Sequence, residues 1–359
     1  MGKFAFIVHP LGAGDIARRF PMARYLPGWL VEKAAGYAPP FKLSDIAGIE
    51  SSSGRAEGFK IAVPLTLRQM SSLSAISISD RIFRAISLAE KLGAGVIGLG
   101  GLTPVAERVG IDPANFKIAV TSGMNYTVAI SIEAIGEAAA LMGYDLKKSS
   151  VVILGAAGQV ESTCAVMLSS RVSRMTLVDK EKGKLKELAE KVLYHSGLSA
   201  RICRDAKSEL QSARIVIAGP GAGVVGTEDF VPGSVVCVLT GTCLLSQSIA
   251  EIRDDVLVVE GGLVSFPGSR ICHSDPRYPP GMICAQMAEA MIMALEGTAG
   301  NITGYGVSLE KVKKIASLAD KHGFKMAGIK GHKEVITQRD VERIKLTARK
   351  NGFSEAAIP

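Results

Sequence analysis

The stretch that decides the fold is Val151–Asp179, which reads VVILGAAGQVESTCAVMLSSRVSRMTLVD. It opens with four apolar residues, Val151–Leu154, a run typical of a buried parallel strand. A glycine-bearing turn, an apolar-faced helix and a second strand, Met175–Val178, follow, and the stretch closes on the acidic Asp179. That order is typical of a dinucleotide-binding βαβ unit. We therefore predict a Rossmann-type nucleotide domain built around this stretch.

The turn and the second strand's end carry the residues predicted to bind the cofactor. Gly155 permits the tight turn, and Gly158 lets the backbone approach a pyrophosphate. The helix that begins there offers N–H groups and a positive dipole end to the phosphates. Asp179 stands where a carboxylate accepts hydrogen bonds from the ribose hydroxyls. The predicted set here is Gly155, Ala156, Gly158, Gln159, Val160, Asp179 and Lys180.

One position departs from the usual glycine motif, because Glu161 stands where the third glycine is expected and the run reads G-x-x-G-x-x-E. That glycine normally serves helix–strand packing, so its loss strains the motif without removing phosphate contacts. A merely structural βαβ turn is the alternative. The flanking strands and Asp179 favour cofactor binding.

The alternation of strands and helices continues beyond Asp179. Further strands expected at Ala200–Cys203, Arg214–Ala218, Val235–Leu239 and Val256–Val259 bring the total to about six, the complement of a doubly wound parallel sheet. Glycine-rich or polar turns follow two of them, at the strand ends where such sheets place the nicotinamide half of the cofactor. We predict contacts there from Gly219 and Thr240.

The first part of the chain predicts a second α/β domain, with a cleft between the two domains. Short apolar strands at Phe4–Val8, Ile61–Leu65 and Ile118–Val120 alternate with helical patterns, and Val128–Met142 is apolar nearly all round. The predicted organisation is an N-terminal α/β substrate domain (1–148), an NAD(P)-binding Rossmann domain (149–270), helices that return to the first domain and close the cleft (271–330), and a basic C-terminal extension (331–359).

Composition excludes several classes of protein. The 359 residues are 47% hydrophobic and 21% charged, which describes a globular protein, and neither a membrane-spanning run nor a cleavable signal pattern is present. Six scattered cysteines without a C-x-x-C pair indicate a reduced, cytoplasmic setting. No cluster has metal-ligand spacing, so we predict no metal, and low aromatic content disfavours nucleic acid. The net charge of +8 is concentrated late, and either an acidic partner or a solvated basic face explains it.

The candidate catalytic residues are Cys284, Ser122 and Asn125. Cys284 falls in the first turn of an expected apolar helix, Met282–Leu295, where a helix N-terminus stabilises the nucleophilic thiolate. The alternative is an inert buried cysteine. Ser122 and Asn125 follow a strand of the first domain and face the expected cleft, where they would bond a substrate carbonyl or the cofactor amide. Capping of the next helix explains them equally well.

A series of short motifs carries a family resemblance from about Val96 to Gly328. In order they are Leu99–Thr103, Thr121–Thr127, Val152–Gly158, Glu260–Val264, Ala288–Met291 leading to Glu296-Gly297, and Val307–Phe324. With these motifs the chain resembles the cyanobacterial long-chain acyl-[acyl-carrier-protein] reductases and their bacterial relatives labelled predicted amino-acid dehydrogenases. The resemblance implies NAD(P)H-dependent reduction of an acyl thioester to an aldehyde, through an acyl-enzyme on Cys284. It also implies an acyl carrier protein or coenzyme A as the carrier of the substrate.

Two other functions stay open at this stage. One is an NAD(P)-dependent dehydrogenase of a small hydroxy or amino acid with the shikimate-dehydrogenase-like plan, in which Cys284 is part of the core. The other is a non-enzymatic nucleotide-binding regulator. The choice of cofactor is also open, since Asp179 favours NAD(H) while Lys180, Lys182 and the family's habit favour NADP(H). The sequence leaves homo-oligomerisation undecided.

Overall fold

The computed structural model describes residues 1–219, 225–239, 243–268, 278–297, 304–332 and 334–352. The chain divides into two compact units, each described here by itself. Unit 1 comprises Met1–Tyr126, Ser265–Gly306 and Lys314–Lys325, and unit 2 comprises Thr127–Val264, Val307–Lys313 and Met326–Pro359. The domain limits after residues 148, 270 and 330, and the cleft between the domains, stay predictions.

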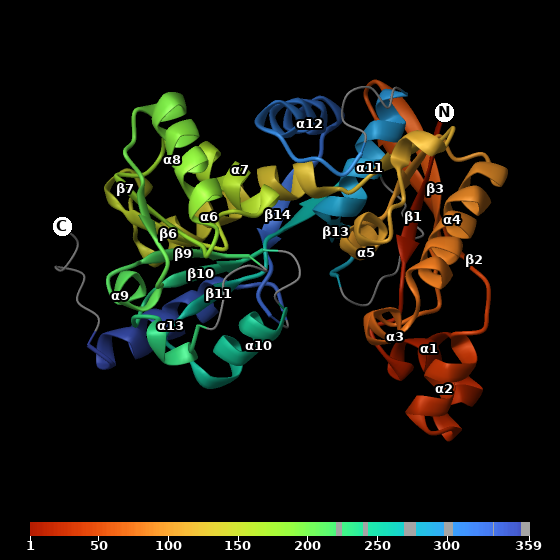
Figure 1. Ribbon diagram of the computed structural model, residues 1–359, viewed down its shortest axis with the longest axis horizontal. Helices are drawn as coiled ribbons and strands as arrows, with labels where there is room; N and C mark the ends of the chain where they lie inside the picture. Colours follow the sequence, from red (N-terminus) through yellow and green to blue (C-terminus); the bar gives the residue numbers. More distant parts are fainter. Residues whose placement is uncertain (220–224, 240–242, 269–277, 298–303, 333, 353–359) are drawn as a thin grey trace. The chain divides into compact units, whose positions relative to one another are not determined.

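Unit 2 is built on a six-stranded sheet with the order β11-β10-β9-β6-β7-β8 (Figure 1). All five strand pairings are parallel, and the order reverses between β6 and β9. This is the strand order of a doubly wound dinucleotide-binding sheet, so the predicted fold class is confirmed. The strands are β6 (Ser150–Leu154), β7 (Arg174–Val178), β8 (Arg201–Cys203), β9 (Ile215–Ala218), β10 (Val235–Val238) and β11 (Leu257–Val259).

Parallel strands that are covered on both faces need apolar residues at successive positions, and those of unit 2 have them. The four residues of β9 and of β10 are all buried, and so are the last four of β6. The helices that alternate with these strands are α7 (Gln159–Leu168), α8 (Lys182–Ser196), α9 (Lys207–Leu210) and α10 (Cys243–Ile252), with α6 (Met124–Met142) before β6 and α13 (Gln338–Lys350) near the C-terminus.

Unit 1 contains a five-stranded sheet with the order β2-β3-β1-β4-β5. The pairings of β1 with β3, β1 with β4 and β4 with β5 are parallel, and β2 is an antiparallel edge strand on β3. The strands are β1 (Gly2–Val8), β2 (Phe41–Ser51), β3 (Gly54–Ala62), β4 (Val96–Gly98) and β5 (Ala119–Thr121).

The helices of unit 1 differ in how much of their surface is buried: α1 (Ala13–Arg19) has no buried residue, α4 (Ala75–Lys91) buries one apolar face, and α11 is buried nearly all round. In α4 the buried residues Ile78, Ile82, Ala85, Ile86 and Ala89 recur at helical spacing and join the core above the sheet. All residues of α11 (Ala285–Glu296) except Gln286 and Glu296 are buried. The others are α1 (Ala13–Arg19), α2 (Gly28–Ala35), α3 (Leu67–Ser72), α4 (Ala75–Lys91), α5 (Thr103–Arg108) and α12 (Leu309–His322), whose first residues belong to unit 2.

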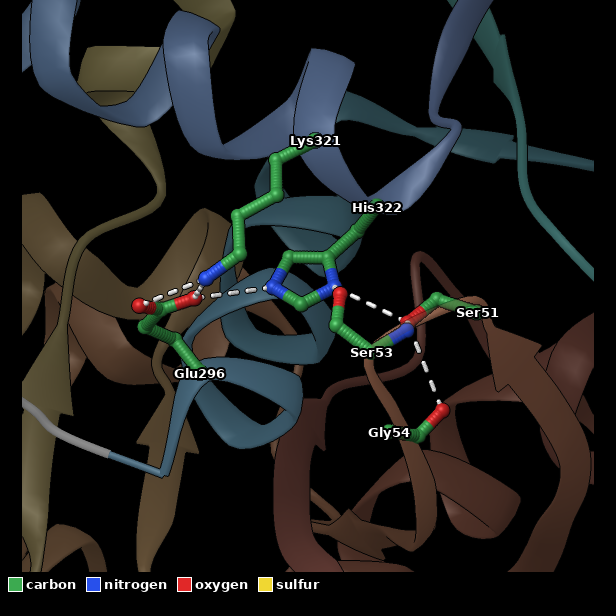
Figure 2. A network of polar contacts seen from close by, with 6 residues as sticks. All are labelled: Ser51, Ser53, Gly54, Glu296, Lys321 and His322. Carbon is green, nitrogen blue, oxygen red and sulfur yellow. Dashed lines mark hydrogen bonds and ion pairs between the residues drawn. The ribbon is translucent and has the colours of Figure 1, made fainter.

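A buried histidine joins three segments of unit 1 (Figure 2). His322, at the end of α12, is 2% exposed; its Nδ1 lies 2.9 Å from the Ser51 hydroxyl at the end of β2. Its Nε2 lies 3.0 Å from a carboxylate oxygen of Glu296, which ends α11 and also accepts from Lys321. Lys321 and His322 together hold the pKa of Glu296 below its ordinary value. The network fixes the β2–β3 hairpin to the two helices.

Three short strands complete the structure: β12 (Gly262–Ser265), β13 (Met282–Cys284) and β14 (Lys325–Ile329). The chain passes from unit 2 into unit 1 within β12. It enters unit 2 again for Val307–Lys313 and returns to unit 2 for the rest of its length within β14. The helix expected from Met282 begins at Ala285, because the residues before it are extended and form β13. Among the described helices, none is long and apolar enough to cross a membrane.

Candidate nucleotide-binding site

The turn after β6 is folded tightly against the end of β7. Gly155 has a φ of +72°, the left-handed conformation that glycine adopts without strain. The N–H groups of Gly155 and Ala156 both donate to the Val178 carbonyl, at 2.9 and 3.1 Å. Gly158 donates to the Gly155 carbonyl at 3.0 Å and is the residue before α7. The first N–H groups of α7 therefore lie directly after the strand, as a phosphate-binding turn requires.

Asp179 is held at this turn by two backbone N–H groups. Its Oδ2 accepts from Ala157 at 3.2 Å and its Oδ1 accepts from Glu181 at 3.0 Å. The structure therefore brings together the predicted turn residues and the predicted ribose-binding acid. Each carboxylate oxygen keeps a lone pair for a further donor. Lys180 is exposed beside it, and Gln159 and Val160 form the first turn of α7.

The end of β9 lies beside the turn, at the point where the strand order reverses. Gly219 donates to the Leu154 carbonyl at 3.1 Å, so the carboxyl ends of β6 and β9 are adjacent. Open α/β sheets bind ligands at this position. Thr240 lies outside the described residues.

No functional role was predicted for Glu161, yet its carboxyl group lies at the centre of this site. The side chain is 3% exposed. A methyl group placed on Gly158 would lie 2.0 Å from Glu161 Oε2, and one placed on Gly219 would lie 1.8 Å from Oε1. The carboxyl group therefore packs against two backbone segments that only glycine leaves open. The sequence signal for this position was the glutamate in place of the third glycine of the motif. Gly158 and Gly219 leave the space that its carboxyl group occupies.

The charge state of Glu161 is unusual. Among the described residues, its Oε1 has no hydrogen-bond partner. Burial raises the pKa of this carboxyl to about 7, with a smaller contribution from the negative charge of Asp179, while a backbone hydrogen bond opposes the rise. Near neutral pH a large fraction of the side chain is therefore protonated. A neutral carboxyl group donates a hydrogen bond, whereas an ionised one repels a phosphate.

Ser122 and Asn125 lie in a second polar cluster, within unit 1, and both are fully buried. The Ser122 hydroxyl accepts from the Met124 N–H at 3.2 Å, which is a local turn contact. Glu289 of α11 accepts from the Thr121 hydroxyl at 2.5 Å and from the Tyr126 N–H at 2.7 Å. A carboxylate there stabilises the positive end of α6. In the sequence, Glu289 stands out as a single charged residue within an apolar helix. The contacts of Glu289 favour a structural role.

Cys284 is the residue before α11 and is half-buried. Its thiol forms no disulfide with another described cysteine and lies at a helix N-terminus. It is close in sequence to Gln286, whose Cα is 2.5 Å from the position of a methyl group placed on Gly123. The polar segment Thr121–Tyr126 and the start of α11 are thus packed together. A nucleophilic role for Cys284 stays a prediction.

Comparison with known proteins gives distant likenesses. No family model matches the chain. The curated aminotransferase PigE of Serratia sp. (strain ATCC 39006) is 26% identical over 367 residues, covering 96% of this chain and 42% of that protein. The chain thus spans less than half the length of this relative.

Solved structures with similar topology include three dehydrogenases. L-tryptophan dehydrogenase from Nostoc punctiforme is 13% identical and aligns over 98% of this chain and 89% of its own, with a TM-score of 0.39. Quinate dehydrogenase from Corynebacterium glutamicum, in complex with NAD, is 13% identical over 71% and 86%, with a TM-score of 0.34. Shikimate 5-dehydrogenase from Listeria monocytogenes, in complex with shikimate and NAD, is 11% identical over 88% and 96%, with a TM-score of 0.35.

These findings correct the family prediction. The assignment to the acyl-[acyl-carrier-protein] reductases is wrong, because the curated relative that the chain matches is an aminotransferase. The predicted reduction of an acyl thioester to an aldehyde, which came from that assignment, is wrong as well. The acyl carrier protein is dropped as a predicted partner for the same reason. The motifs that carried the resemblance contain glycines and small polar residues at strand ends, which many α/β proteins share.

Proposed function

We propose that the chain is an NAD(P)(H)-dependent oxidoreductase, a dehydrogenase that acts on a small hydroxy or amino acid. The observation that carries the proposal is the turn Gly155–Val160 at the point of strand-order reversal, with Asp179 bonded to its backbone. The described cysteines form no disulfide with one another, which accords with a cytoplasmic location, and we include that location in the proposal.

The residues of the site fit a dinucleotide. Gly155 and the first turn of α7 leave N–H groups for a pyrophosphate, and the Asp179 carboxylate accepts from a ribose. Oε1 of Glu161, which is buried against Gly219 and has no partner among the described residues, matches a phosphate oxygen when the side chain is protonated. When bound, the nicotinamide supplies hydride transfer. The chain's own residues hold and orient it.

The proposal is tested by measuring turnover with NAD and NADP on a panel of small 2-hydroxy and 2-amino acids. We expect nucleotide-linked oxidation of at least one member. Asp179→Asn removes a charged acceptor for the ribose, so we expect the KM for NAD to rise about tenfold with a smaller change in kcat.

The matched control is Asp205→Asn, which alters an exposed acid two residues after the end of β8. We expect it to leave both constants unchanged. Nucleotide binding without turnover on any substrate would favour the regulator over the dehydrogenase. If neither NAD nor NADP bound to the chain, the whole proposal would be contradicted.

A further inference from the structure

The segment 11–37 of unit 1 folds back on itself between β1 and β2. It contains α1, the short helix Pro21–Tyr25 and α2, and Figure 1 shows α1 and α2 lying together. Glu32 Oε1 accepts from the Ala13 N–H at 3.2 Å, and Gln69 of α3 donates to the Glu32 carbonyl at 2.8 Å. The inner side of the segment lines a cavity of about 740 Å³ at the carboxyl ends of β1 and β3. The segment is therefore a folded part of unit 1.

The same segment is rich in exposed apolar residues. Of the eighteen large hydrophobic residues that are exposed in the described part of the chain, eight lie between Leu11 and Tyr37. Tyr25 is 85% exposed, Met22 is 77% exposed and Trp29 is 66% exposed. Single exposed apolar residues are normal on a protein surface, whereas a concentration of them marks an interaction site.

The helical geometry directs these side chains away from the packed side of the segment. With about three residues per turn, Met22 and Tyr25 lie on one face of the short helix. In α2, Val31 is buried, and Trp29 lies about 200° around the helix from it. Lys33 follows Trp29 by four residues and shares its face. The exposed apolar residues are thus on a different face from the one that packs into unit 1.

The exposed charges of the segment all have the same sign. Its exposed charged residues are Arg18, Arg19, Arg24 and Lys33. The two acids, Asp15 and Glu32, are half-buried, and both already accept hydrogen bonds from the segment itself. We call the exposed apolar and basic residues of segment 11–37 the α1–α2 face. This face presents positive charge among aromatic and aliphatic side chains.

The composition of the α1–α2 face indicates what covers it. A second copy of the chain, docked about a two-fold axis, would bring the same basic residues of two protomers together. A nucleic acid would stack on Trp29 and Tyr25 but would leave the exposed Met22 and Leu26 without a partner. A lipid surface with anionic headgroups suits all of these residues. Basic side chains attract the headgroups, Trp and Tyr lie at the headgroup level, and Met and Leu enter the acyl boundary.

We propose that the α1–α2 face docks the protein peripherally on a bilayer that contains anionic lipids. Its aromatic and aliphatic side chains enter the interface, and Arg19, Arg24 and Lys33 pair with the lipid phosphates. Helices that bind in this way lie in the plane of the interface. The face belongs to unit 1, whereas the nucleotide turn belongs to unit 2, and lipid docking goes beyond the proposed redox activity.

The chain carries a natural reporter for this face, because Trp29 is its only tryptophan. The test is fluorescence titration of the full chain with vesicles of phosphatidylcholine and with vesicles in which about one third of the lipid is phosphatidylglycerol. We expect the Trp29 emission to shift to shorter wavelength, and binding to the anionic vesicles to be about tenfold tighter. High salt should weaken this binding, since it screens the attraction between the charges.

The basic residues are tested by the double variant Arg19→Gln/Arg24→Gln, which keeps the reporter and removes two positive charges. It should bind the anionic vesicles about tenfold more weakly than the wild type does. The matched control is Lys186→Gln/Lys191→Gln, which removes the same charge from exposed positions of α8 in unit 2. We expect this control to bind like the wild type.

The apolar residues are tested by Met22→Ser/Tyr25→Ser, which leaves the charge unchanged and should also weaken binding about tenfold. Its matched control is Leu193→Ser/Tyr194→Ser, because these two residues are exposed on α8. Thermal unfolding establishes that each variant is folded before it is titrated.

Three results would each overturn the proposal of lipid docking: equal binding to the two kinds of vesicle, no shift of the Trp29 emission, or equal affinities of the wild type and Arg19→Gln/Arg24→Gln. An emission shift that depends on protein concentration without lipid would also overturn it, because the face would then bind a second copy of the chain. A failure of NAD(P) binding would leave these titrations unaffected.

Discussion

At the scale of single residues, the most informative side chain is Glu161. Its pKa of about 7 in the folded protein lies above its ordinary value of 4.5, so the folded state binds an extra proton between these pH values. Stability therefore falls as pH rises from about 4.5 through about 7, and the full penalty applies above that range. The difference corresponds to about 3 kcal/mol, at about 1.4 kcal/mol for each pH unit.

We accordingly predict that Glu161→Gln raises the free energy of unfolding at pH 8 by up to about 3 kcal/mol and has little effect at pH 5. The amide keeps the size of the side chain and cannot ionise. Urea unfolding at the two pH values measures the effect, with the exposed Glu187→Gln as the control. An equal change at both pH values would show that ionisation of Glu161 is not the cause.

The same residue predicts a pH dependence of nucleotide affinity. Protonated Glu161 can donate to a phosphate oxygen, while the ionised form adds negative charge beside that of Asp179. We expect the Kd for NADH to rise about tenfold between pH 6 and pH 8 in the wild type, and to stay nearly constant in Glu161→Gln. A parallel pH dependence in both proteins would place the titrating group elsewhere.

At the scale of elements, strands β6, β9, β10 and β11 of unit 2 were predictable because both faces of each are buried. Their apolar runs are continuous. The strand expected at Val151–Leu154 is found as β6. The edge strand β2 was not predicted, since only Ile46 and Ile49 of its eleven residues are buried. β3 begins at Gly54, well before the expected Ile61. The first residues of this strand were missed because they are partly exposed.

The residues of the candidate site also differ in how well the sequence predicts them. Gly155, Gly158 and Asp179 carry their roles in local sequence spacing, and the structure places them together. The position of the Glu161 carboxyl depends on Gly219, which is 58 residues further along the chain, so no local pattern reveals it. Glu289 likewise reaches Tyr126 across 163 residues.

That long-range contact gives a prediction for α11. Glu289→Ala leaves the Tyr126 N–H and the Thr121 hydroxyl buried without this acceptor, so we expect a loss of about 2 to 4 kcal/mol in the free energy of unfolding. Glu187→Ala, on the exposed face of α8, serves as the control and should lie within about 0.5 kcal/mol of the wild type. A loss of less than about 1 kcal/mol for Glu289→Ala would show that these hydrogen bonds are not needed.

At the scale of the whole molecule, the chain contains two α/β units, each with a mostly parallel sheet and each with a feature at the carboxyl ends of its strands. Unit 2 has the glycine turn with Asp179 and Glu161, and unit 1 has a cavity with a mostly apolar lining. The glycine turn is the part of the molecule that we propose to bind the nucleotide.

Binding at the turn also predicts a change in stability. A ligand that binds only the folded state stabilises it by about 2.7 kcal/mol at a concentration one hundred times its Kd. With NADH we expect slower hydrogen exchange at the amides of Ala156–Val160 and at Gly219, and little change at the N-terminal strand β1. Protection spread evenly over both units, or absent from the turn, would contradict this site.

The central claim is that the turn after β6 binds a nicotinamide dinucleotide, and calorimetric titration of the wild-type chain with NADH and NADPH at pH 6 tests it most directly. We predict saturable binding of at least one of them, weakened about tenfold by Asp179→Asn and unchanged by Asp205→Asn. No saturable heat with either nucleotide, or equal binding in the wild type and Asp179→Asn, would contradict the account.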